Sequence, residues 1–213
     1  MTPILYSFRR CPYAMRARLA VSVSGVEVEL REIVLRDKAP AFLEVLPSAT
    51  VPCLDDKGTV IDESLDVMIW ALNQNDPDGW LEMPEVGFDL ISEADGPFKQ
   101  ALDRTKYHTR YPDLDREDSR DGAMALLNRL EPQLADGFLF GARPSLADMA
   151  ILPFVRQFAF IDKTRFDADA GPHLSRWLET FLASDLFATI MPKLPKWIEG
   201  DAPTVFQGTI SQA

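Results

Sequence analysis

Cysteine is scarce in this chain of 213 residues, which contains only Cys11 and Cys53. Two cysteines cannot build a disulfide framework or a zinc cluster, and such usage fits a reducing cytoplasm, where we expect the protein to reside. Histidine is equally rare, with two residues. The acidic cluster from Asp113 to Asp121 lacks the spacing and the glycine of a calcium loop, so the sequence predicts no bound metal.

Long hydrophobic runs and an excess of positive charge are also missing. No stretch approaches the roughly 18 apolar residues of a membrane span, and the N-terminus lacks the pattern of a signal peptide. With 22 Lys and Arg against 33 Asp and Glu, the net charge is −11. That balance argues against nucleic acid or an anionic membrane as a partner. Hydrophobic residues make up 46% of the chain, enough for the core of a soluble protein with one large or two small domains.

The first third of the chain alternates predicted strands and helices. Short apolar or alternating runs indicate strands, and longer periodic runs indicate helices. Pro12 and Gly25 are the start and stop signals of the first helix, and Asp55 to Gly58 is a hairpin signal. The order is βαβαββα, with elements at 4–8, 12–25, 26–31, 40–46, 50–54, 59–61 and from 64 onward.

Beyond this region the character of the sequence changes to long helical patterns. Gly96-Pro97 interrupts the first of them, and Ser145 and Asp148 have the spacing of a capping box at the start of a later one. The sequence therefore predicts an α/β domain at 1–75, a linker at 76–84 and an all-helical domain at 85–213.

Cys11 is the residue that we expect to carry chemistry, because it lies where an apolar strand turns into a helix. A thiol at this position meets backbone N–H groups without helical partners and the positive end of the helix dipole, and both favour the thiolate. Arg9 and Arg10 directly before it add positive charge. The sequence thus predicts an activated nucleophile.

Taken together, four motifs resemble the glutathione transferase superfamily over nearly the whole chain. They are Cys11-Pro12-Tyr13 at the first helix, Val51-Pro52 before the hairpin, Glu63-Ser64 at a helix start, and Ser145-Leu146-Ala147-Asp148 in the helical region. The resemblance implies a thioredoxin-like domain with a mixed four-stranded sheet, followed by an all-α domain. A cysteine at the first helix, in place of tyrosine or serine, is similar to the omega class and the two-domain glutaredoxins.

The resemblance also implies a glutathione site. Val51, before a cis Pro52, would meet the cysteinyl part of glutathione through its backbone. Glu63 would face the γ-glutamyl ammonium, and Ser64 with its helix N-terminus would take the carboxylate. Lys38 is similar to the omega-class lysine that meets the glycine carboxylate, and Tyr13 would form an aromatic wall beside Cys11. An acceptor pocket would be lined by Phe8, Tyr107, Tyr111 and Trp177.

Plainer interpretations stay open for several of these residues. Glu63-Ser64 is also what an ordinary helix cap looks like, and Lys38 could be a solvated loop charge. Cys53, next to Pro52, is a candidate second redox cysteine, but a free cysteine inside a strand is usually a small buried hydrophobe.

The chemistry implied is that of a glutathione-dependent thiol transferase. Ala14 stands where many two-domain glutaredoxins carry a second cysteine, so Cys11 is expected to act alone, with a second glutathione as its resolving partner. Candidate second substrates are small disulfides, glutathionylated thiols and dehydroascorbate. A conventional transferase that conjugates or isomerises an electrophile is an alternative, as is a non-enzymatic interaction module on the same fold. A homodimer is possible.

Overall fold

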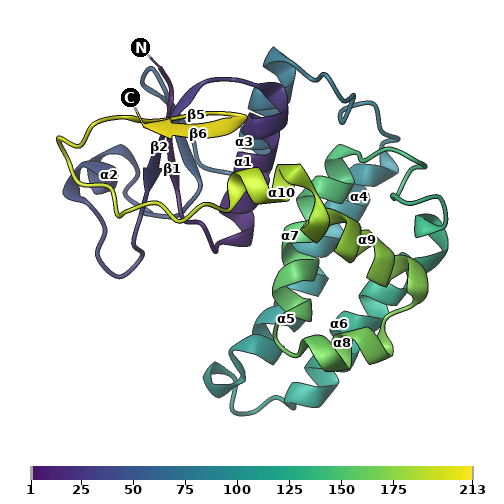
Figure 1. Ribbon diagram of the computed structural model, residues 1–213. Coiled ribbons are helices and arrows are strands. Elements are labelled where there is room, and N and C mark those ends of the chain that lie inside the picture. Colours follow the sequence, from purple (N-terminus) through teal and green to yellow (C-terminus); the bar gives the residue numbers. More distant parts are fainter. Residues whose placement is uncertain (1, 213) are drawn as a thin grey trace. The chain divides into compact units, whose positions relative to one another are not determined.

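The structure is a computed structural model that describes residues 2–212, with side-chain burial described for residues 2–208. The chain forms two compact units. The first runs to Leu81 and resumes at Ala183, and the second is Glu82–Leu182. Figure 1 labels the elements of both.

The first unit is built on a six-stranded sheet in the order β4-β3-β1-β2-β5-β6. β1 and β2 are parallel, and the other neighbouring pairs are antiparallel. The strands are β1 (Ile4–Ser7), β2 (Val28–Glu32), β3 (Cys53–Asp56), β4 (Thr59–Ile61), β5 (Thr204–Gln207) and β6 (Thr209–Gln212). Burial alternates along β2, as its alternating sequence predicts.

Helices cover both faces of this sheet. They are α1 (Pro12–Ser24), α2 (Pro40–Val45), α3 (Ser64–Gln74) and α10 (Asp185–Ile190). α1 packs against α3 and α10, and α2 lies on the other side of the strands (Figure 1). α1 ends at Gly25, whose φ of 67° is a left-handed conformation that glycine adopts at little cost.

The predicted fold class is confirmed, since β1 to α3 form a thioredoxin-like unit and a helical unit follows. The sheet nevertheless has two strands more than the four predicted. β5 and β6 come from the segment assigned by sequence to the helical domain, and they extend the β2 edge. The physical reason is that an unpaired β2 edge would expose N–H and C=O groups. Val28 pairs with the fully buried Phe206 instead.

The second unit consists of helices and the loops that join them. The α-helices are α4 (Val86–Glu93), α5 (Lys99–Lys106), α6 (Arg116–Asn128), α7 (Leu146–Ala159), α8 (Lys163–Asp169) and α9 (Pro172–Ala183), with shorter turns η1 (Ala94–Phe98), η2 (His108–Arg110) and η3 (Glu131–Leu134). The interruption predicted at Gly96-Pro97 is the π-helical turn η1. Proline offers no N–H to a regular helix, and the wider turn carries the chain past it.

The start of α7 contains the capping box that its sequence predicts. The Asp148 N–H is bonded to Ser145 Oγ, and Asp148 Oδ2 accepts from the Ser145 N–H at 2.8 Å. The other carboxylate oxygen, Oδ1, accepts from the Leu139 N–H and from Trp177 Nε1, both at 2.9 Å. Burial raises the pKa of Asp148, although these hydrogen bonds oppose the shift. Asp148 therefore joins α7, α9 and the preceding loop inside the helical unit.

Candidate active site

Cys11 is the N-cap residue of α1, just past the end of β1. A tight turn leads to it, in which the Cys11 N–H donates to the Phe8 carbonyl at 3.0 Å. The Cys11 carbonyl accepts the first helical bond, from the Met15 N–H at 2.9 Å. Its half-buried thiol makes no capping bond and donates to the Val51 carbonyl, with Sγ 3.6 Å from the oxygen. The sulfur therefore lies at the positive end of α1.

A cavity of about 420 Å³ opens beside this sulfur, within the range of small-molecule sites. It is lined by the seven residues that the sequence assigns to catalysis and glutathione binding: Cys11, Tyr13, Lys38, Val51, Pro52, Glu63 and Ser64. Four lining residues were not foreseen, namely Leu35, Ala49, Thr50 and Asp62. They are neighbours of the predicted residues in loops that lack a motif of their own. One cavity thus gathers side chains from α1, α3 and the loops flanking α2.

The Val51-Pro52 peptide bond is cis, and both residues are buried and line the cavity. Cys53, the next residue, is completely buried in the hydrophobic cluster beneath them. Burial, with Asp62 and Asp55 adding negative charge, raises the pKa of the Cys53 thiol to about 12. Cys53 is therefore a core residue whose thiol stays protonated at neutral pH.

Glu63 and Ser64 lie at the start of α3 and also line the cavity. Glu63 is the exposed N-cap residue and makes no capping bond, so its carboxylate is not engaged as an ordinary helix cap. Ser64 is buried, and its Oγ accepts from Arg16 Nη1 at 3.2 Å. Because the hydroxyl accepts from Arg16, its proton can be donated to a carboxylate at the helix N-terminus.

Arg16 is a candidate site residue that no sequence motif reveals. It lies on α1 and is only 1% exposed, beneath Ser64 and with its guanidinium 5.6 Å from the centre of the Tyr13 ring. A buried guanidinium bonded to Ser64 adds positive charge where the γ-glutamyl carboxylate is expected. One sequence signal points to Arg16: it is a charged residue in a helix that must pack against a sheet, so it could be expected to be buried.

The side chains of the two arginines before Cys11 contact residues other than Cys11. Arg9 donates from Nη1 to the Met191 carbonyl at 3.3 Å, and the Arg10 guanidinium lies 5.5 Å from the centre of the Phe8 ring. The backbone N–H of Arg9 donates to Glu32 Oε1 at 2.8 Å. These contacts order the turn before α1.

The residues expected to line an acceptor pocket differ in their surroundings. Phe8 packs against the hydrophobic cluster beside Cys11. Tyr107 is half-buried, with Arg110 over its ring, and Tyr111 is 37% exposed. Trp177 is a correction to the expectation, because it is completely buried and its indole N–H is bonded to Asp148. It belongs to the core of the helical unit.

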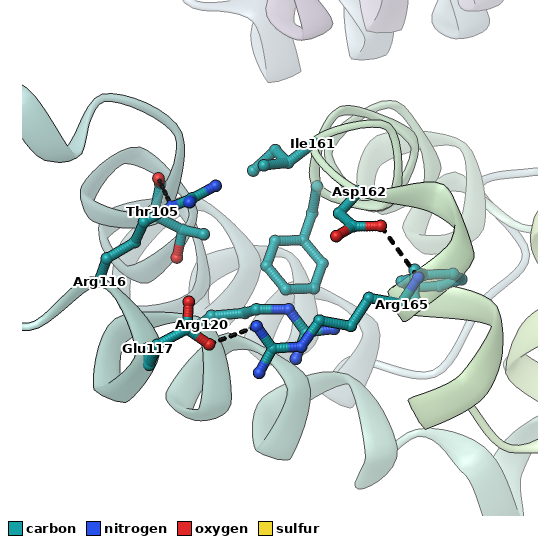
Figure 2. Close-up of a pocket in the computed structure, with 9 residues that line it drawn as sticks. Thr105, Arg116, Glu117, Arg120, Ile161, Asp162 and Arg165 are labelled. Carbon is teal, nitrogen blue, oxygen red and sulfur yellow. Dashed lines mark hydrogen bonds and ion pairs between the residues drawn. The ribbon is translucent and has the colours of Figure 1, made fainter.

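A second, small cavity in the helical unit is lined by Glu117 of the acidic cluster together with arginines (Figure 2). Arg165 forms an ion pair with Glu117 across it, and Arg120 Nη2 lies 2.7 Å from Asp169 Oδ2. Glu117 of the cluster and Asp169 thus pair with arginines of the same unit. Within residues 2–212, no group of three or more His, Cys, Asp or Glu side chains is placed to hold a metal ion. No helix in that range is both long and apolar enough to cross a membrane.

Comparison with known proteins agrees with this arrangement. The family models for the glutathione S-transferase N-terminal and C-terminal domains match residues 5–79 and 99–180. Glutathione S-transferase L3 of Arabidopsis thaliana is 30% identical over 200 residues, which cover 88% of this chain and 81% of that protein. Glutathione transferase Omega 3C from Trametes versicolor has a TM-score of 0.75 at 18% identity, covering 88% and 83% of the two chains. A family member from Pseudomonas fluorescens, solved with two glutathione bound, has a TM-score of 0.74 at 19% identity, covering 89% and 92%.

A thioredoxin-like unit with its cavity at the first helix, followed by a helical unit, defines the glutathione transferase class of proteins. This chain belongs to the glutathione S-transferase family and is a glutathione transferase. The interaction module considered from sequence is therefore set aside.

Proposed function

We propose that this transferase catalyses glutathione-dependent thiol transfer through Cys11 by a monothiol mechanism. The observation that carries the proposal is that Cys11 lines the same cavity as Val51, Glu63 and Ser64. A thiol in that place would lie beside the sulfur of a bound glutathione. A cysteine there can form a disulfide with glutathione, which a hydroxyl cannot.

Glutathione fits the chemistry of the lining residues. Glu63 is a free carboxylate for the γ-glutamyl ammonium, and Ser64 with Arg16 is a donor pair for its carboxylate. Lys38, a half-buried residue of the cavity lining, suits the glycine carboxylate. Val51, which also lines the cavity, is the residue whose backbone would meet the cysteinyl part. Tyr13 supplies a wall beside the sulfur.

The reaction that follows has two exchange steps. The Cys11 thiolate attacks the glutathionyl sulfur of a mixed disulfide, so the substrate thiolate leaves and takes a proton from water. The thiolate of a second glutathione then attacks the glutathionyl sulfur on Cys11, releasing oxidised glutathione and the Cys11 thiolate. Helix α1 helps most in this second step, since a stabilised thiolate is the better leaving group.

The surroundings of Cys11 support the monothiol form. Ala14 is fully buried where a resolving cysteine would stand, and Cys53 is buried with a pKa of about 12. Neither position offers a second thiolate, so glutathione itself must resolve the mixed disulfide. The second substrate, a small disulfide, a glutathionylated thiol or dehydroascorbate, and a homodimeric state remain predictions.

The test is the rate of thiol transfer from glutathione to a small mixed disulfide. We expect Cys11→Ser to abolish it and the matched variant Cys53→Ala to retain it. Equal rates in the parent and Cys11→Ser would overturn the proposal. If Cys11→Ala, which has no hydroxyl at position 11, instead kept conjugation of an electrophile, a hydroxyl such as that of Tyr13 or Thr50 would be the activating group, and the conventional transferase would be the correct assignment.

A further inference from the structure

We propose that Glu32 is a positioning residue whose buried carboxylate fixes the turn that presents Cys11 at the start of α1. The inference deepens the proposed function, on which it rests only in taking Cys11 as the reacting group. Nothing in the sequence motifs around Cys11 points to Glu32, which lies on a different strand.

One carboxylate connects the strand, the turn and the helix. Ser7 at the end of β1 is opposite Glu32 at the end of β2, so the turn leaves the sheet beside Glu32. Glu32 Oε1 accepts from the Arg9 N–H in the middle of the turn at 2.8 Å. Its other oxygen, Oε2, lies 3.7 Å from Nη1 of Arg18, which is about two helical turns beyond Cys11 on α1.

The ion pair between Glu32 and Arg18 is not expected to stabilise the fold by itself. The Arg18 side chain is fully buried and that of Glu32 is 10% exposed. Burial raises the pKa of Glu32 in spite of the Arg9 hydrogen bond and the charges of Arg18 and Arg9. Burial also lowers the pKa of Arg18 to about 10 in spite of Glu32. Desolvation therefore outweighs the attraction between the partners.

A buried pair of this kind can often be replaced by apolar residues of similar volume without loss of stability. The hydrogen bond that Glu32 Oε1 accepts from the Arg9 N–H gives the pair a role in this fold. That bond holds the backbone of Arg9 two residues before Cys11, and so sets where the N-cap residue and its sulfur lie relative to the first N–H groups of α1. Arg18 serves as the charge that lets the carboxylate remain in the interior.

Two double variants separate the hydrogen bond from the charge pair. Arg18→Met with Glu32→Gln removes both charges but keeps an oxygen that can accept from the Arg9 N–H. Arg18→Met with Glu32→Leu removes the charges and the acceptor. The measurement is the rate at which iodoacetamide alkylates Cys11 at pH 7, followed by peptide mass spectrometry. Cys53 is an internal control, because it is alkylated only if the fold opens.

We expect the Gln variant to react within about twofold of the parent and the Leu variant to react about tenfold more slowly, the effect of one lost hydrogen bond. A Leu variant that reacts at the parent rate would overturn the inference, as would a Gln variant as slow as the Leu variant. Rapid labelling of Cys53 in both would show that the pair stabilises the fold, which also contradicts it. The assay contains no glutathione, so failure of the proposed transferase function is a separate result.

Discussion

The two cysteines show how far surroundings decide what a residue can do. Cys11 opens into a cavity at a helix start, whereas Cys53 is enclosed by the core beneath Pro52. With a pKa of about 12, the Cys53 thiol at pH 7 is ionised in only about one molecule in 10⁵. The sequence identifies both residues as candidates, but their burial distinguishes them.

At the residue scale, Glu63 provides a test of the glutathione site. Glu63→Gln removes the carboxylate expected to face the γ-glutamyl ammonium, so KM for glutathione should rise about tenfold, the scale of one charge-assisted bond. The free energy of unfolding should change by no more than about 0.5 kcal/mol, since the exposed side chain makes no capping bond. Steady-state kinetics and denaturant unfolding measure the two effects.

Glu85→Gln is the matched control. Glu85 is likewise an exposed N-cap residue without a capping bond, at the start of α4. We expect it to leave both KM and stability unchanged. An equal rise of KM in the two variants would mean that the effect comes from net charge, and no rise in Glu63→Gln would remove Glu63 from the site.

The candidate site could be predicted where its residues carry local signals. Cys11 at a strand-to-helix junction, Val51-Pro52 and Glu63-Ser64 are short patterns that need no knowledge of distant contacts. Arg16 and Glu32 escaped prediction because their roles depend on contacts with Ser64 and Arg9, far away in the sequence. Long-range packing of a buried charge leaves no such pattern.

At the scale of elements, the start and stop signals of α1 gave its bounds, because proline and glycine act on the backbone directly. The third strand was predicted at 50–54 but lies at Cys53–Asp56. Its pairing with β1, in which Tyr6 is opposite Cys53, decides where it begins. The strands β5 and β6 were missed altogether, although β-branched and aromatic residues flank Gly208.

The capping box of α7 permits a prediction about stability. Ser145→Ala removes one capping bond and should lower the free energy of unfolding by about 1 kcal/mol. Asp148→Ala leaves the Leu139 N–H and the Trp177 indole N–H without their acceptor, so we expect a loss of about 3 kcal/mol or more. Denaturant unfolding of both variants measures the difference.

Asp115→Ala supplies the comparison for a simple cap. Asp115 caps α6 through the N–H groups of Glu117 and Asp118 but is exposed to solvent. It should cost about 1 kcal/mol, like Ser145→Ala. If Asp148→Ala cost no more than Asp115→Ala, the view of Asp148 as a buried connection between α7 and α9 would be wrong.

At the scale of the whole chain, the C-terminal segment is part of the sheet unit that carries the site. The Trp197 N–H donates to the Glu32 carbonyl at 2.9 Å, and its ring lies 6.1 Å from that of Tyr6. Trp197 shares one hydrophobic cluster with residues between Ile33 and Val51, the stretch that includes Lys38 and one wall of the cavity. Trp197 thus packs against a stretch of the first quarter of the chain that lines the cavity.

Trp197→Leu should therefore affect glutathione binding from outside the cavity. We expect KM for glutathione to rise about tenfold with little change in kcat, because a wall that moves by a fraction of an ångström misplaces Lys38 and Val51. Ile198→Ala, next in sequence and 61% exposed, is the control and should match the parent. A Trp197→Leu protein with parental KM would show that the wall does not depend on this segment.

The central claim is that Cys11 carries glutathione as a covalent intermediate. The most direct measurement is peptide mass spectrometry of the protein after reaction with excess glutathionyl mixed disulfide and acid quenching. The account predicts one glutathionyl group on Cys11, none on Cys53, and loss of the group when reduced glutathione is added before quenching. Thiol transfer that proceeds at the parental rate in Cys11→Ser, with no adduct on Cys11 in the parent, would contradict it.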